Sequence, residues 1–269
     1  MSPSISATAH PDDVAPELRD AFVRTVLALA DDKLMIGHRN SDWTGLAPIL
    51  EEDIAFSSLA QDEIAHAAAL YEFVAPLTGS TADQIAFNRS PQAYHCADIT
   101  VLPDEFDWAT ALSRQFLCAH YEVLMLERFA TSSHEGLAAL SRRQLAEQHV
   151  HTRHASDWVE RLGPGTPEAH ERMQSALNAL AAPAVALFEP VDGQDDVVAA
   201  GLIGGDDFRT FETWATTIQG VLSRSNLSIK LPILDTTTVG GRRGTHTPVL
   251  AELLDEMCEV FRSDPDAAW

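Results

Sequence analysis

The chain has 269 residues, with 18 Lys or Arg against 40 Asp or Glu, so its formal net charge is −22 at neutral pH. This balance excludes the function classes that need clustered cations, which are nucleic-acid binding and attachment to anionic membranes, and it favours a protein partner with a basic surface. Because 45% of the residues are hydrophobic, the chain has enough apolar side chains to form a folded core.

Two further features bear on the class of protein. The longest uncharged run, residues 173–188, contains a proline and is too short to cross a membrane. No apolar run precedes Arg19, so we expect neither a membrane-spanning segment nor a signal peptide. The cysteines form no Cys-x-x-Cys pair, which is typical of free thiols in a cytoplasmic protein. They are Cys96, Cys118 and Cys258.

The sequence predicts an all-α fold. Residues 1–15 show no periodicity and are expected to form a flexible tail before a single helical domain over residues 16–269. Apolar residues then recur at intervals of three and four, and no long alternating Val, Ile and Thr segment competes with them. The predicted helices, in chain order, are 16–38, 48–73, 104–130, 133–162, 167–188, 206–223 and 248–261, with a loop near 76–103.

Each of the first four predicted helices carries polar residues on its apolar face. In the first helix Lys33 stands where the 3/4 spacing calls for a leucine, and in the second Glu63 and His66 face inward one turn apart. Glu122 lies at the edge of the third face, and His151 lies in the middle of the fourth. Burying such groups costs several kcal/mol unless they are paired or bind a metal, so the four interruptions predict one shared interior site.

A four-helix bundle that holds two iron or manganese ions explains this pattern, since it uses one Glu from each of two helices and Glu-x-x-His from each of the other two. The residues at these positions are Lys33, Glu63, His66, Glu122, Gln148 and His151. One ammonium against two glutamates leaves a single negative charge, whereas a complete site offers four carboxylates. The sequence therefore predicts a degenerate di-iron site, in which Lys33 pairs with Glu63 and Glu122 and replaces the metal electrostatically.

Two alternatives to this ion-pair cluster stay open. Lys33 could extend to solvent at the end of its helix, as long basic side chains often do. A metal could also be retained, with Glu147 turned inward in place of Gln148. The candidate metal ligands in that case are Glu63, His66, Glu122, Glu147 and His151.

A Gly-rich basic loop, residues 240–247 (GGRRGTHT), precedes the last predicted helix. Adjacent guanidinium groups beside a helix N-terminus suit a phosphate or a carboxylate. We therefore expect Arg242 and Arg243 to contact the phosphates of coenzyme A or an acidic surface of a partner. The alternative is an ordinary loop that leads into a helix at Pro248.

Four segments resemble the C subunits of bacterial phenylacetyl-CoA 1,2-epoxidases, which are multicomponent monooxygenases that epoxidise an aromatic ring. These segments are 29–43 (LADDKLMIGHRNSDW), 47–55 (APILEEDIA), 158–163 (WVERLG) and 240–247. The resemblance implies a ferritin-like four-helix bundle core with additional C-terminal helices. It also implies a non-catalytic accessory subunit in phenylacetate catabolism. In such complexes a homologous catalytic chain holds the di-iron centre, and the complex binds an aryl-acyl-CoA.

The string Gln61-Asp62-Glu63-Ile64-Ala65-His66 matches the pattern of the catalytic subunits in this family, whereas Lys33 and Gln148 do not. The leading interpretation is thus a cytoplasmic accessory subunit without a cofactor of its own, bound to a catalytic homologue or forming a homodimer. The alternative is a free-standing ferritin-like di-metal oxidase or hydroxylase.

Overall fold

The computed structural model describes residues 9–10 and 13–264, so most of the predicted N-terminal tail lies outside the described residues. The part of that segment that is described packs against the helices. Ala9 and Val14 are buried, and the Ala9 N–H donates to the Phe73 carbonyl at 3.0 Å. These two residues therefore belong to the core rather than to a solvated tail.

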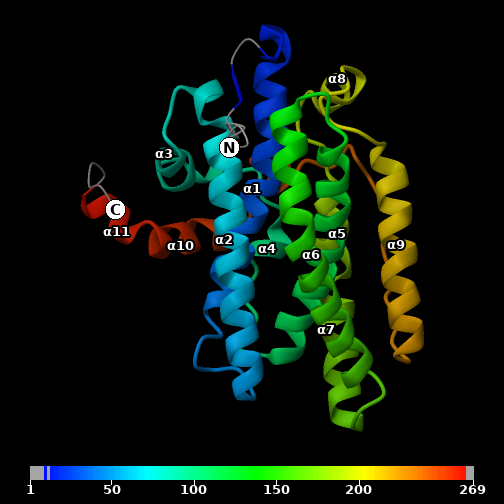
Figure 1. Ribbon diagram of the computed structural model, residues 1–269. Helices are drawn as coiled ribbons and strands as arrows, with labels where there is room; N and C mark the ends of the chain where they lie inside the picture. Colours follow the sequence, from blue (N-terminus) through cyan, green and yellow to red (C-terminus); the bar gives the residue numbers. More distant parts are fainter. Residues whose placement is uncertain (1–8, 11–12, 265–269) are drawn as a thin grey trace, which may run out of the picture.

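Four long helices run side by side and form the bundle (Figure 1). Short loops join α1 (Arg19–Ser41) to α2 (Leu50–Thr78) and α5 (Trp108–Ala130) to α6 (Glu135–Leu162), so the bundle consists of two helical hairpins. The described residues form no β-strand, and the predicted all-α, ferritin-like fold is confirmed. No helix among them is long and apolar enough to cross a membrane.

Side-chain caps explain where several helices begin. The Asp107 carboxylate accepts from the Thr110 N–H at 3.0 Å and fixes the start of α5. Thr166 caps α7 (Pro167–Val185) in the same way, with Pro167 at the position where a missing N–H costs nothing. Asp206 caps α9 (Asp207–Arg224). The predicted starts of these three helices, 104, 167 and 206, lie within four positions of the observed ones.

The segment between the hairpins is more helical than predicted. Helix α2 continues through Pro76 to Thr78, because a proline this close to the end removes only one hydrogen bond of the helix. The predicted loop also contains α3 (Ala82–Phe87), η3 (Pro91–Ala93) and α4 (Asp98–Val101). A reciprocal cap between Thr81 and Gln84 starts α3.

Shorter elements surround the bundle. A turn, η2 (Pro16–Leu18), precedes α1, and η4 (Ala186–Phe188) extends α7. Helix α9 runs along one outer side, while α10 (Pro248–Met257) and α11 (Glu259–Ser263) project from the opposite side (Figure 1). Two further elements, α8 (Gln194–Ala199) and η5 (Gly241–Arg243), were not predicted, and the last predicted helix is divided at Cys258.

A close approach of α1 and α2 positions the bundle interior. A Cβ atom at Gly37 would lie 2.9 Å from the Ile64 side chain and 3.2 Å from the Ala60 carbonyl oxygen. Only glycine leaves room for this contact, one helical turn from Lys33. The two helices are therefore near enough for Lys33 to reach Glu63 without leaving the apolar core.

Candidate functional site: a lysine-centred cluster in the bundle

The structure brings one side chain from each long helix together around Lys33, which has no solvent exposure. The Lys33 Nζ lies 2.7 Å from Glu63 Oε2 on α2 and 2.8 Å from Glu122 Oε2 on α5. It lies 2.7 Å from Gln148 Oε1 on α6. The three N–H groups of the ammonium thus have one oxygen partner each. Lys33 does not extend to solvent, and the polar residues of the four stripes meet at one point.

The charges in this cluster shift the pKa of each member. Burial disfavours the Lys33 ammonium, but Glu122 and Glu63 more than offset this cost and raise the pKa of Lys33. Burial also disfavours the charged form of both glutamates, and by itself it would raise their pKa values. Lys33 and His151 hold the pKa of Glu63 well below its usual value. Burial together with the charge on Glu63 raises the pKa of Glu122 to about 8.

Two histidines lie beside the lysine, between α2 and α6. The His151 Nδ1 is 2.9 Å from Glu63 Oε1, and its Nε2 is 3.1 Å from Asp62 Oδ2. Burial lowers the pKa of His151, but the hydrogen bonds to Glu63 and Asp62 outweigh burial and raise it overall. The His66 Nε2 lies 2.6 Å from Glu147 Oε2. The histidines therefore bind carboxylates across the seam between the hairpins.

The structure decides which of two neighbouring residues on α6 faces the interior. Gln148 is buried against Lys33, whereas the Glu147 side chain is 58% exposed and reaches only His66. A third pair, His154 Nε2 and Glu52 Oε2 at 2.8 Å, joins α2 and α6 nearer the end of the bundle. The inward position that a metal site would give to a carboxylate is thus taken by a neutral amide.

The residues of this cluster do not fit a di-iron centre. The Lys33 ammonium lies between the two glutamates, in the space that a cation would need, and uses their facing oxygens. Within the described part of the chain, no group of three or more His, Cys, Asp or Glu side chains is arranged to hold a metal. An ammonium and two metal ions cannot share this space, because their like charges would be buried together.

Sequence reasoning missed a second set of buried charges on α1. Asp31 and Asp32 directly precede Lys33 and are also fully buried. Asp31 accepts from Arg89 and from the Tyr71 hydroxyl at 2.7 Å, while Asp32 accepts from the Ala97 N–H at 2.8 Å. Three consecutive charged residues within the otherwise apolar stretch 26–37 of this helix were the available signal. They indicate that α1 is enclosed on all sides.

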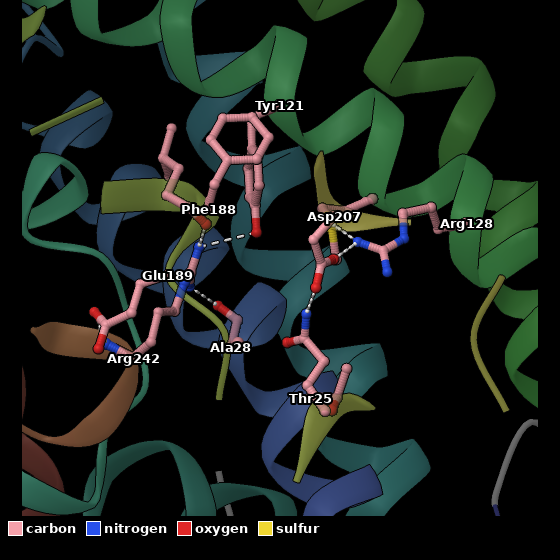
Figure 2. Close-up of a pocket in the computed structure, with 11 residues that line it drawn as sticks. Thr25, Ala28, Tyr121, Arg128, Phe188, Glu189, Asp207 and Arg242 are labelled. Carbon is pink, nitrogen blue, oxygen red and sulfur yellow. Dashed lines mark hydrogen bonds and ion pairs between the residues drawn. The ribbon is translucent and has the colours of Figure 1, made fainter. Parts of the chain in front are cut away.

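Arg242 is the ion-pair partner of Asp32, and this corrects the expectation that it contacts a ligand or partner. Its side chain is 1% exposed, with Nη2 2.6 Å from Asp32 Oδ2 and 3.0 Å from the Tyr121 hydroxyl. Figure 2 shows the guanidinium directed inward, toward Ala28 and Tyr121. It also donates to backbone carbonyls of α1, of the segment before α4 and of η4, which are those of Ala28, His95 and Leu187.

The space beside Arg242 is also too small for a phosphate ligand. The cavity drawn in Figure 2 measures ≈ 20 Å³, which is room for about one water molecule. Arg243 lies nearer the surface, where its Nε is 2.9 Å from Glu189 Oε1 and its side chain is 19% exposed. Through Arg242, the loop 240–247 therefore links the C-terminal segment to α1. A ligand contact for Arg243 stays a prediction.

Comparison with known proteins agrees with this architecture. The family model described as phenylacetic acid catabolic protein matches residues 5–269. The C subunit of the 1,2-phenylacetyl-CoA epoxidase of Escherichia coli (strain K12) is 28% identical over 244 residues, which cover 90% of this chain and 97% of that protein. The resemblance found in the four sequence segments is confirmed. The chain therefore belongs to the family of phenylacetic acid catabolic proteins.

Proposed function

We propose that this chain is a non-catalytic accessory subunit of an aromatic-ring epoxidase that acts on an aryl-acyl-CoA such as phenylacetyl-CoA. In this role it binds and stabilises a homologous catalytic chain, and that homologue holds the di-iron centre. The family match and the similarity to one subunit of a known epoxidase support the reaction and the assembly.

The observation that carries the non-catalytic role is the position of Lys33. Its ammonium makes ion pairs with Glu63 and Glu122 at 2.7 and 2.8 Å, where a bundle oxygenase would place metal ions. The Lys33 ammonium thus supplies the positive charge that balances the buried glutamates. A cluster of this kind stabilises the bundle but offers no open coordination position for oxygen.

The test is co-expression with a candidate catalytic homologue, followed by separation of the two chains and metal analysis of each. The proposal expects a stable complex in which iron is found with the catalytic chain. Epoxidase activity is expected to require this complex. About two equivalents of iron in the present chain, when purified alone, would overturn the proposal in favour of a free-standing di-metal oxidase. Failure to form any complex with the homologue would overturn the accessory role.

A further inference from the structure

Helix α2 exposes large apolar side chains on a side turned away from the lysine-centred cluster. Leu50, Ile54 and Ile64 are exposed on the helix, and Leu46 and Ile49 are exposed in the loop before it. Five of the eleven large apolar side chains that are exposed in the described chain therefore lie within this one stretch. We call these five residues the α2 ridge. Exposed apolar groups that are gathered in this way mark an interaction surface, whereas scattered ones do not.

The helical residues of the α2 ridge share one side of the helix, but Ile64 lies ten positions beyond Ile54 and its side chain also lies against Gly37 of α1. Leu50, Ile54 and Ile64 follow one side of α2 at helical spacing. The exposed positions between them on that side, Ser58 and Gln61, are small or polar, so the surface is open to a flat partner. The inward side of α2 is filled separately by Phe56, Leu59 and other buried residues. The first half of α2, with the loop 42–49 beside it, forms an edge of the bundle in Figure 1. The ridge is thus additional to the core face.

The charges around the α2 ridge are of one sign. Helix α2 has six acidic residues and no Lys or Arg, and two of the six, Glu52 and Glu63, are buried in pairs with His154 and Lys33. The remaining acids point partly or fully to solvent, and none of them has an ion pair with Lys or Arg among the described residues. They are Glu51, Asp53, Asp62 and Glu72. The α2 ridge is therefore an apolar surface on a helix whose solvent-facing carboxylates have no Lys or Arg partner in the described chain, and of these four only Asp62 pairs with a histidine, His151.

This charge pattern distinguishes between possible occupants. A second copy of the chain, placed by two-fold symmetry, would set α2 against α2 and its acids against acids, in a protein of net charge −22. A different protein that presents apolar side chains bordered by Lys or Arg can pack against the α2 ridge and also form ion pairs with the carboxylates. We propose that the α2 ridge binds such a helical surface on the catalytic partner. This inference rests on the accessory role proposed above.

The test compares two substitutions at residues of equal exposure. Ile54 and Phe208 are each 60% exposed, but only Ile54 belongs to the α2 ridge. Binding of the purified catalytic homologue is measured by titration calorimetry with the wild type, Ile54→Glu and Phe208→Glu. The expected result is that Ile54→Glu weakens binding at least about tenfold, as at a central interface position, while Phe208→Glu leaves it unchanged.

Charge reversal gives a second measurement. Glu51→Lys and Glu72→Lys are expected to weaken binding several-fold at low salt, and the difference from wild type is expected to shrink at high salt. Both residues lie on the surface without an ion-pair partner among the described residues, so the variants are expected to fold, which circular dichroism checks.

The outcomes separate the two proposals. If the wild type binds the catalytic homologue and Ile54→Glu binds it equally well, the ridge proposal is overturned and the accessory role stands. If the wild type does not bind, the accessory role itself is overturned. If light scattering shows that the chain alone is a dimer that Ile54→Glu dissociates, the occupant is a second copy and the proposal of a basic partner is wrong.

Discussion

Replacing Lys33 with Met tests the central ion-pair cluster. Methionine has nearly the same length and keeps the apolar stem, but it leaves Glu122 buried without a cation and Glu63 with His151 alone. Removing one partner of a buried pair costs about 3–5 kcal/mol of unfolding free energy, because the remaining charge has lost its compensation. For a chain of this size that loss lowers Tm by roughly 6–10 °C, at about 2 °C per kcal/mol.

The loss is expected to depend on pH. In the wild type the pKa of Glu63 is lowered, so its ion pair contributes stability above the pKa of an unfolded glutamate and loses it as the pH falls. In Lys33→Met the buried glutamates lose the ammonium, and their pKa values rise. At pH 5 they escape the penalty by binding protons, whereas at pH 8 they cannot. The difference in unfolding free energy between wild type and variant should therefore be larger at pH 8 than at pH 5.

Urea unfolding followed by circular dichroism at the two pH values measures this difference. The matched control is Lys33→Met combined with Glu63→Gln and Glu122→Gln, which removes the uncompensated carboxylates and should recover most of the lost stability. A loss below about 1 kcal/mol at pH 8, which is the value of an exposed pair, would refute the reasoning. An equal loss at pH 5 and pH 8 would also refute it.

Three further predictions concern the same interior. The pKa of Glu122, raised to about 8, means that wild-type stability falls by up to about 1.4 kcal/mol per pH unit between pH 5 and pH 8, and Glu122→Gln should remove this decline in urea unfolding. Lys33→Glu with Gln148→Glu supplies the missing carboxylates and should increase bound iron or manganese by elemental analysis, whereas Lys33→Gln should not. Arg242→Met should cost about 3–5 kcal/mol in thermal unfolding and Arg243→Met less than about 1 kcal/mol, and similar losses for both would contradict the buried role of Arg242.

The lysine-centred cluster could be predicted because the spacing of residues along a helix determines the direction in which each side chain points. Lys33 and Glu63 each interrupt an apolar stripe, and helices that pack side by side bring interruptions at the same height together. The same reasoning left Glu147 and Gln148 open, because adjacent residues are only about 100° apart on a helix and both can border a stripe. The packing of α6 against α2 decides between them.

The pairing of Arg242 could not be predicted in this way. It lies 210 positions from Asp32, in a segment without helical periodicity, so no spacing rule connects the two. Position 241 requires a glycine, because a Cβ atom there would lie 2.2 Å from the Cys96 carbonyl oxygen. This constraint exists only in the folded chain and could not be predicted from the sequence. Adjacent arginines in a loop suggested a ligand, and the structure buries one of them instead.

The three consecutive buried charges of α1, residues 31–33, fix the register of that helix. Successive side chains leave a helix about 100° apart, and each of these three forms an ion pair with a residue from a different part of the chain. A shift by one position in one direction would set Lys33 against Arg242, and a shift in the other would set Asp32 between the two glutamates. Either error buries like charges together, so α1 has a single low-energy alignment, which apolar side chains of similar size do not by themselves impose.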